Sequence, residues 1–215
     1  MTDEIELTPD LLLQGYRAGV FPMSETRDSD DVFWVDPKFR GVLPLDGFHI
    51  SRSLRKRLIK AEYRISFNTC FQDVVRGCAD RDETWINDTI FDLYAGLFDQ
   101  GDAACCEVWR DQTLVGGVYG VTIGGAFFGE SMFSTATDAS KVALAYLTDR
   151  LRLGGFTLFD TQFITDHLAS LGGIEIKRAA YHALLRDALK VNATFPADAA
   201  IPAAQDLIQR NTQTS

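Results

Sequence analysis

The chain has 215 residues, a formal net charge of −9 at pH 7 and 46% hydrophobic residues. This length allows one sizeable core, or one main domain with a small appendage. The negative charge argues against a protein that coats nucleic acid electrostatically, although it leaves room for a local basic patch.

The N-terminal segment MTDEIELTPDLLLQGY is acidic and has no basic region followed by an apolar one, so no signal peptide is expected. The longest apolar runs are too short to span a bilayer. The four cysteines, Cys70, Cys78, Cys105 and Cys106, form no C-x-x-C pair and have no His at a ligand spacing. We therefore expect a cytoplasmic protein with inert thiols, no bound metal and no membrane contact.

The first part of the chain predicts a small N-terminal subdomain over residues 1–38. Residues 8–18 have the pattern of a short helix, with Thr8 as N-cap and Gly19 as its end. A strand-like run, 32–35, stops before Pro37.

Residues 39–195 predict the main domain. Helices are expected over 51–61, 71–79, 89–98 and 138–153, the last capped by Asp138, and further ones over 163–170 and 178–190. Strands are expected over 63–67, 104–110, 113–122, 125–133 and 156–159, the three longest forming an antiparallel meander. This order favours an α+β fold with a mixed, acyltransferase-like sheet flanked by helices over a doubly wound one. The Ala-, Pro- and Gln-rich residues 196–215 predict a flexible tail.

Four features could carry chemistry, and each has a plainer structural interpretation. Glu130 stands among apolar neighbours, where it lines a pocket or forms an ion pair with a residue such as Lys141. Asp160 and Gln162 follow a buried strand on one side of the chain, although Asp160 or Thr161 could instead cap the next helix.

The other two features concern nucleic acid. Helix 52–60 carries five basic residues and no acid, which is typical of a solvated face or of a phosphate-binding surface. Trp85 lies in a polar stretch, where it packs in the core or stacks on an unpaired base. The glycines of 116–120 lack phosphate-loop spacing and indicate a strand with a close backbone approach.

Taken together, the motifs resemble those of the bacterial leucyl/phenylalanyl-tRNA–protein transferase family. The matching segments span about residues 8–190 and include YRAGVFP (16–22), FWVDP (33–37), HISRSL (49–54), TWI (84–86), LVGGVYGV (114–121), FFGESMFS (127–134), DTQ (160–162) and HLASLG (167–172). The resemblance implies a small N-terminal domain on a GNAT-like domain. It also implies transfer of Leu or Phe, and less readily Met, from tRNA to an N-terminal Arg or Lys of an acceptor protein, which marks that protein for N-degron proteolysis.

The resemblance also assigns roles to residues. It places the catalytic pair on Asp160 and Gln162. The positions that contact the aminoacyl group and adenosine are Met23, Trp85, Val118, Phe127, Glu130 and Ser131, with Met23 where the family commonly has Trp. The basic cluster that holds the tRNA acceptor stem corresponds to Arg52, Arg55, Lys56 and Lys60. A further departure is Gly101–Cys106, which replaces a common G-H-A-H-S segment.

This reaction needs no cofactor, because an aminoacyl ester is already activated. We hypothesise that Asp160 receives or relays the proton of the attacking amine while Gln162 orients the amine and carbonyl. Leu and Phe would be selected by apolar fit, and the basic helix would bind phosphates without reading bases. Two alternatives are a GNAT-like acyltransferase with a CoA donor, disfavoured by the lack of a Q/R-x-x-G-x-G/A loop, and a non-catalytic binder of tRNA ends or peptide N-termini.

Overall fold

The computed structural model describes residues 7–24, 32–82 and 84–213. One seven-stranded sheet forms the frame, in the order β4-β5-β6-β7-β8-β3-β9, and a separate two-stranded sheet joins β1 (Phe21–Ser24) to β2 (Val32–Val35). The large sheet contains β3 (Phe39–Val42), β4 (Arg64–Phe67), β5 (Ala103–Arg110), β6 (Thr113–Ile123), β7 (Ala126–Ser134), β8 (Leu158–Gln162) and β9 (Ile174–Lys177). All neighbouring strands are antiparallel except β7 and β8, which run parallel.

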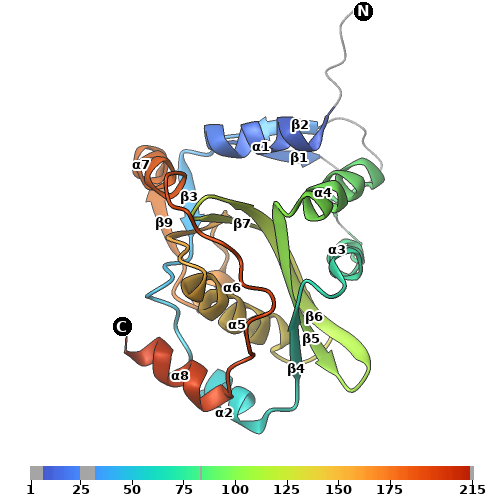
Figure 1. The fold of residues 1–215 in the computed structure, drawn as a ribbon, viewed down its shortest axis with the longest axis vertical. Coiled ribbons are helices and arrows are strands. Elements are labelled where there is room, and N and C mark those ends of the chain that lie inside the picture. Colours follow the sequence, from blue (N-terminus) through green and yellow to red (C-terminus); the bar gives the residue numbers. More distant parts are fainter. Residues whose placement is uncertain (1–6, 25–31, 83, 214–215) are drawn as a thin grey trace, which may run out of the picture.

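Helices cover both faces of this sheet (Figure 1). One core contains α2 (Arg52–Lys60), α5 (Ala139–Leu153), α6 (Asp166–Ala169) and α8 (Ala204–Thr212). The core on the other face contains α1 (Pro9–Ala18), α3 (Phe71–Ala79), α4 (Asp88–Gln100) and α7 (Arg178–Ala188). The predicted mixed sheet flanked by helices is therefore confirmed, as is the antiparallel meander β5-β6-β7.

Local signals explain several helix ends. Thr8 Oγ1 accepts from Leu11 N, and Gly19 ends α1 with φ of 89°. Gly101 ends α4 in the same way. The predicted cap of α5 is wrong: Asp138 has left-handed φ and its side chain makes no capping bond, because its carboxylate pairs with Lys141 Nζ at 3.0 Å.

Some predicted boundaries and elements are also wrong. Residues 163–165 are not helical, and α6 begins at Asp166 behind the N-cap Thr165. The sequence does not predict the strands β1, β3 and β9, because each has only four residues, too few for a periodic pattern to stand out. Part of the segment predicted to be a flexible tail forms the helix α8, which buries Leu207 and Ile208 in the core.

Two predictions from composition can be compared with the structure. All four cysteines are free thiols, and burial raises the pKa of Cys70 to about 11 and that of Cys78 to about 12. Within the described residues, no helix is both long and apolar enough to cross a membrane.

Candidate active site

A cleft opens where the two parallel strands of the sheet part. β7 and β8 pair from Ala126 with Leu158 to Phe128 with Asp160, and the pairing ends there. Beyond that point lies a pocket of about 350 Å³. Such a volume suits a small organic group. Its wall includes residues from β6, β7, β8, α5, α6 and the segment between α3 and α4, so both faces of the sheet contribute.

A β-bulge shapes the β7 side of the cleft. Tyr119 of β6 pairs with Ser131 and Gly120 with Gly129, which leaves Glu130 as the extra residue. A bulge can turn two consecutive side chains to one face, and both Glu130 and Ser131 contact groups on the α1–α3–α4 side. Gly120 allows this close approach, since a Cβ there would lie 2.2 Å from the Phe128 carbonyl oxygen. The predicted close backbone approach in the 116–120 strand is confirmed.

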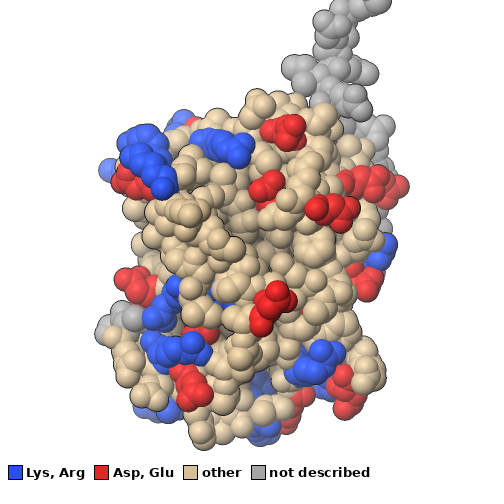
Figure 2. Space-filling model, viewed as in Figure 1, with Lys and Arg blue, Asp and Glu red and all other residues tan. Residues whose placement is uncertain are grey.

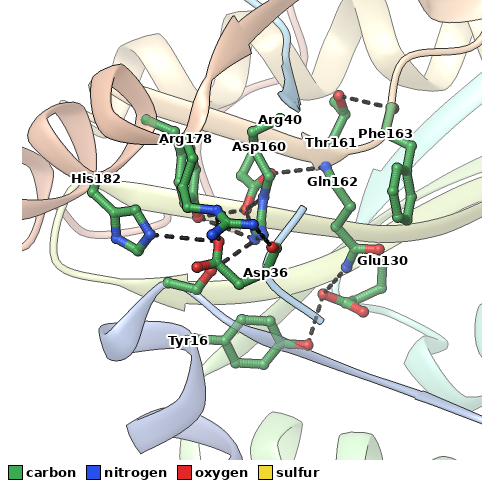
Figure 3. Close-up of polar contacts among 12 residues, drawn as sticks. Tyr16, Asp36, Arg40, Glu130, Asp160, Thr161, Gln162, Phe163, Arg178 and His182 are labelled. Carbon is green, nitrogen blue, oxygen red and sulfur yellow. Dashed lines mark hydrogen bonds and ion pairs between the residues drawn. The ribbon is translucent and has the colours of Figure 1, made fainter. Parts of the chain in front are cut away.

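Neutral donors surround the Glu130 carboxylate. Tyr16 Oη donates to Oε1 at 2.7 Å and Gln162 Nε2 donates to Oε1 at 3.0 Å (Figure 3). Tyr94 Oη donates to Oε2 at 2.6 Å. The two tyrosine hydroxyls also lie 2.7 Å apart. Three hydrogen-bonding contacts thus link the two tyrosines and the carboxylate, but the hydroxyls supply two protons. A proton on the Glu130 carboxyl would supply the third, so that each of the three contacts would have one proton.

Burial raises the pKa of Glu130 to about 7, against the lowering effect of the hydrogen bonds from Tyr94, Tyr16 and Gln162. Desolvation disfavours the charged carboxylate, and the Asp160 carboxylate adds repulsion. Glu130 is 8% exposed and lines the pocket. A carboxyl group that titrates near neutral pH and reaches a cleft is able to accept a proton from a bound amine.

Asp160 has the opposite environment. Its carboxylate is fully buried and accepts from Arg40 Nη2 at 2.7 Å, from Arg40 Nε at 2.9 Å and from Tyr181 Oη at 2.7 Å. The Arg40 guanidinium lies between the rings of Phe21 and Tyr181, 4.4 and 4.3 Å from their centroids, and donates to the Gly19 carbonyl. Asp160 therefore belongs to a closed ion pair and is not among the residues that line the pocket.

Gln162 joins the two carboxylates. Its backbone N donates to Asp160 Oδ1 at 2.8 Å, and its side chain reaches Glu130 (Figure 3). It has φ of 62°, a left-handed conformation that is uncommon outside glycine and is often found at functional sites. A register shift in β8 opposite Gly41 and Val42 accompanies this turn. Asp160 thus fixes the backbone from which Gln162 enters the cleft.

The structure brings together most of the residues predicted to bind the aminoacyl group. Trp85, Val118, Glu130 and Ser131 all line the pocket with Gln162. Phe127 does not, because it is buried behind Phe159 with ring centroids 5.1 Å apart. Met23 lies in β1, opposite Phe33, outside the pocket wall.

The predicted tRNA-binding residues lie elsewhere. Arg52, Arg55, Lys56 and Lys60 are exposed on α2, at the opposite end of the molecule from α1 (Figure 1). On the face shown in Figure 2, residues of both charges are interspersed around a large uncharged area.

Several structural interpretations of the sequence are wrong. Glu130 does not pair with Lys141, which pairs with Asp138. Neither Asp160 nor Thr161 caps the next helix, since Thr165 does. Sequence reasoning also missed several residues of the site, which are Tyr16, Arg40, Arg81, Tyr94 and Tyr181. Tyr16 lies in the YRAGVFP segment, whereas Arg40, Tyr94 and Tyr181 had no signal because burial of a polar side chain is not readable from spacing.

Comparisons with known proteins place the fold and the family. The fold resembles that of FemX, with a TM-score of 0.50, 12% identity, and coverage of 78% of this chain and 66% of that chain. This likeness agrees with the predicted mixed sheet flanked by helices. A likeness at this identity carries information on the fold alone.

Sequence relatives are much closer. The chain is 63% identical to the leucyl/phenylalanyl-tRNA–protein transferase of Ruegeria sp. (strain TM1040), over 97% of this chain and 99% of that protein. It is 61% identical to the protein of the same name from Dinoroseobacter shibae, over 89% and 86%, and 56% identical to that of Roseobacter denitrificans, over 98% and 100%. The family pattern "Leucyl/phenylalanyl-tRNA protein transferase" matches residues 42–186, and that of its N-terminal domain matches residues 5–38. The chain therefore belongs to the leucyl/phenylalanyl-tRNA–protein transferase family.

Proposed function

We propose that this protein moves Leu or Phe, and less readily Met, from aminoacyl-tRNA to the N-terminal Arg or Lys of an acceptor protein. One observation carries the proposal: the cleft between β7 and β8 joins an apolar wall to a carboxylate and an amide, Glu130 and Gln162. The names of the close relatives support aminoacyl-tRNA as the donor. The product would carry a new N-terminal Leu or Phe, which would mark it for N-degron proteolysis in the cytoplasm.

The apolar wall would hold the side chain of the donor amino acid. It consists of Val118, Met132, Leu144, Phe159 and Leu168. Apolar fit favours unbranched side chains of the right size, at about 1–3 kcal/mol per methylene, so some transfer of Met is expected. Trp85, whose ring lies edge-on to Tyr94 with centroids 6.5 Å apart, would stack on the terminal adenine.

The polar wall would carry out the chemistry. The acceptor nitrogen attacks the ester carbonyl, the new C–N bond forms, the C–O bond to the ribose breaks, and a proton passes from nitrogen to the ribose oxygen. An α-amino group has a pKa of about 7.7–8.0, so part of it is neutral at cytoplasmic pH. Glu130 would take this proton from the attacking nitrogen, hold it as the third proton among its hydrogen bonds with Tyr16 and Tyr94, and release it to the ribose oxygen as the C–O bond breaks.

Asp160 and Gln162 would act as a unit, with Asp160 as a positioning residue. The Asp160 carboxylate is enclosed by Arg40, Tyr181 and the Gln162 backbone, so direct contact with the amine would require that ion pair to open. Gln162 donates to Glu130 through its nitrogen. Its carbonyl oxygen is the end that can accept from the incoming amine.

Helix α2 would hold the acceptor stem of the tRNA. Its exposed Arg52, Arg55, Lys56 and Lys60 can contact phosphates without reading bases, which suits an enzyme that must accept several tRNAs. Affinity for charged tRNA should then fall as salt rises.

The test is transfer of radiolabelled Leu, Phe, Met or Val from tRNA to a peptide that begins with Arg, with an N-acetylated copy of the peptide as control. Leu and Phe should transfer well, Met less and Val hardly at all. Acetyl-CoA is offered in parallel. Transfer from acetyl-CoA alone would favour the CoA-dependent alternative, and tight binding of charged tRNA without product would favour a non-catalytic binder.

A further inference from the structure

The C-terminal segment is fastened to the main domain by a buried arginine. Arg150 of α5 is 1% exposed, and its guanidinium lies 4.3 Å from the centroid of the Phe67 ring. Its Nη1 donates to the carbonyls of Pro196 at 2.8 Å and Ala199 at 2.7 Å. A buried guanidinium left without these acceptors would be costly, so the path of the chain after Phe195 is fixed by α5.

This path brings α8 against the basic helix. Figure 1 shows α8 and α2 side by side at one end of the molecule. The buried Leu207 and Ile208 of α8 share a core with Leu54 and Leu58, the buried residues of α2. The α8 segment lies outside the family-matched residues 42–186.

A hydrogen bond from the C-terminal end of α8 reaches the segment that leads into α2. Asn211 Nδ2 donates to the Phe48 carbonyl at 2.7 Å, three residues before the N-cap Ser51. Arg210 Nε lies 3.3 Å from Asp149 Oδ1 of α5. Thus α8 bridges α5 and the start of α2.

Helix α2 depends on such support. It has nine residues, and helices of this length are marginal in water unless their apolar face is packed. Leu54 and Leu58 form that face, and the exposed cations stand on the other side. Whatever fixes the buried face therefore also fixes where those cations point.

We propose that α8 is a positioning element for the donor: through Leu207, Ile208 and Asn211 it sets the orientation of the basic helix α2, and so the affinity for the body of the tRNA. The inference rests on the proposed function, because it assumes that α2 contacts tRNA. No residue of α8 lines the cleft between β7 and β8, so we expect changes in α8 to leave the chemical step unaltered.

The experiment compares two donors in the full-length protein. One is Phe-tRNA, and the other is 3′-O-phenylalanyl-adenosine, which lacks the acceptor stem. Asn211→Ala should raise the KM for Phe-tRNA by about two- to tenfold, the effect of one lost hydrogen bond, and leave the KM for the small donor and both kcat values unchanged. Gln209→Ala, the same kind of truncation on an exposed position of α8, is the matched control and should change neither KM.

A double-mutant cycle separates positioning from general loss of structure. In an Arg55→Ala/Lys56→Ala background the basic helix already contacts tRNA less well. Asn211→Ala should therefore raise the KM for Phe-tRNA by a smaller factor there than it does alone. Ile208→Val provides a second, milder change at the buried contact with the same expected direction.

Three outcomes would overturn the inference. The KM for Phe-tRNA could be unchanged in both Asn211→Ala and Ile208→Val, or the KM could rise equally for both donors. The third is that the effect of Asn211→Ala on KM is as large in the Arg55→Ala/Lys56→Ala background as it is alone. If the wild type transfers from neither donor, the proposed function itself fails. If the wild type transfers and the variants match it, the proposed function stands and the positioning role does not.

Discussion

Two buried carboxylates, Glu130 of β7 and Asp160 of β8, lie on neighbouring strands, and their surroundings differ in kind. Asp160 is paired with a cation, Arg40, and both side chains are almost fully excluded from solvent. Glu130 has the neutral donors Tyr16, Tyr94 and Gln162 and reaches the cleft. The Glu130 carboxyl, buried among neutral donors, has a raised pKa and can gain or lose a proton near neutral pH.

The comparison assigns a task to each region. The Arg40–Asp160 pair connects the Gly19 carbonyl of the N-terminal segment, Tyr181 of α7 and the Gln162 backbone, so it stabilises architecture. Tyr16, Tyr94 and Glu130 share three hydrogen-bonding contacts but only two tyrosyl protons, so this group is suited to exchange a proton.

The largest effect is expected when the ion pair is broken. Arg40→Met leaves Asp160 buried and unpaired, which should lower the free energy of unfolding by about 3–5 kcal/mol. Urea denaturation measures the loss. The double variant Arg40→Met/Asp160→Leu should recover part of the stability, since no unpaired charge remains. An equal loss in both would mean that packing around Arg40, and not charge, stabilises this region.

A change in the other region should remove activity and leave the fold in place. Glu130→Gln has nearly the same shape but cannot accept a proton, so kcat should fall by about a hundredfold or more. The wild-type rate should rise with pH through about 7, where Glu130 ionises, and the variant should lose that step. A variant with the wild-type rate and the same pH profile would exclude Glu130 as the proton acceptor.

The sequence predicted the two regions to different extents. Hydrophobic patterns located the strand that carries Glu130, but they ended the next buried strand at residue 159, whereas β8 continues through Asp160 to Gln162. Motif resemblance identified all three residues. Neither could show that Glu130 is the extra residue of a bulge, because a bulge depends on the register between β6 and β7. The partners were missed for a related reason: Arg40 and Tyr181 reach Asp160 from positions 120 and 21 residues away in the chain.

The structure of the C-terminal segment is also hard to predict from local sequence patterns. Its composition resembles that of a disordered tail, and two adjacent apolar residues, Leu207 and Ile208, are too weak a pattern to predict a docked helix. Its order comes from partners far away in sequence, such as Arg150 and Phe48. Short elements that depend on tertiary contacts are therefore the ones that sequence patterns miss.

The raised pKa of Glu130 predicts how stability should depend on pH. Between its ordinary value of 4.5 and about 7, the unfolded chain releases this proton while the folded protein keeps it. The contribution is therefore fully present below pH 4.5 and is lost as pH rises to about 7, by roughly 3 kcal/mol at about 1.4 kcal/mol per pKa unit. Glu130→Gln lacks this loss, so the variant should gain stability relative to the wild type from pH 4.5 to 8, as measured by urea midpoints. A constant difference across that range would contradict a raised pKa.

The smallest and most discriminating effect comes from one chemical change made in both regions. Tyr16→Phe removes a donor to Glu130, which should raise the pKa of this carboxyl further and move the rise of kcat to higher pH. Activity should fall several-fold at pH 7 and recover at pH 8.5. Tyr181→Phe removes a donor to Asp160 but none to Glu130, and Arg40 still donates to the Asp160 carboxylate, so the pH profile should not shift. Because both variants lose one buried hydroxyl, a general loss of structure would affect them alike. Equal shifts in the two profiles would mean that the carboxylates titrate as one coupled pair, and the division between a fixed and a proton-exchanging region would not hold.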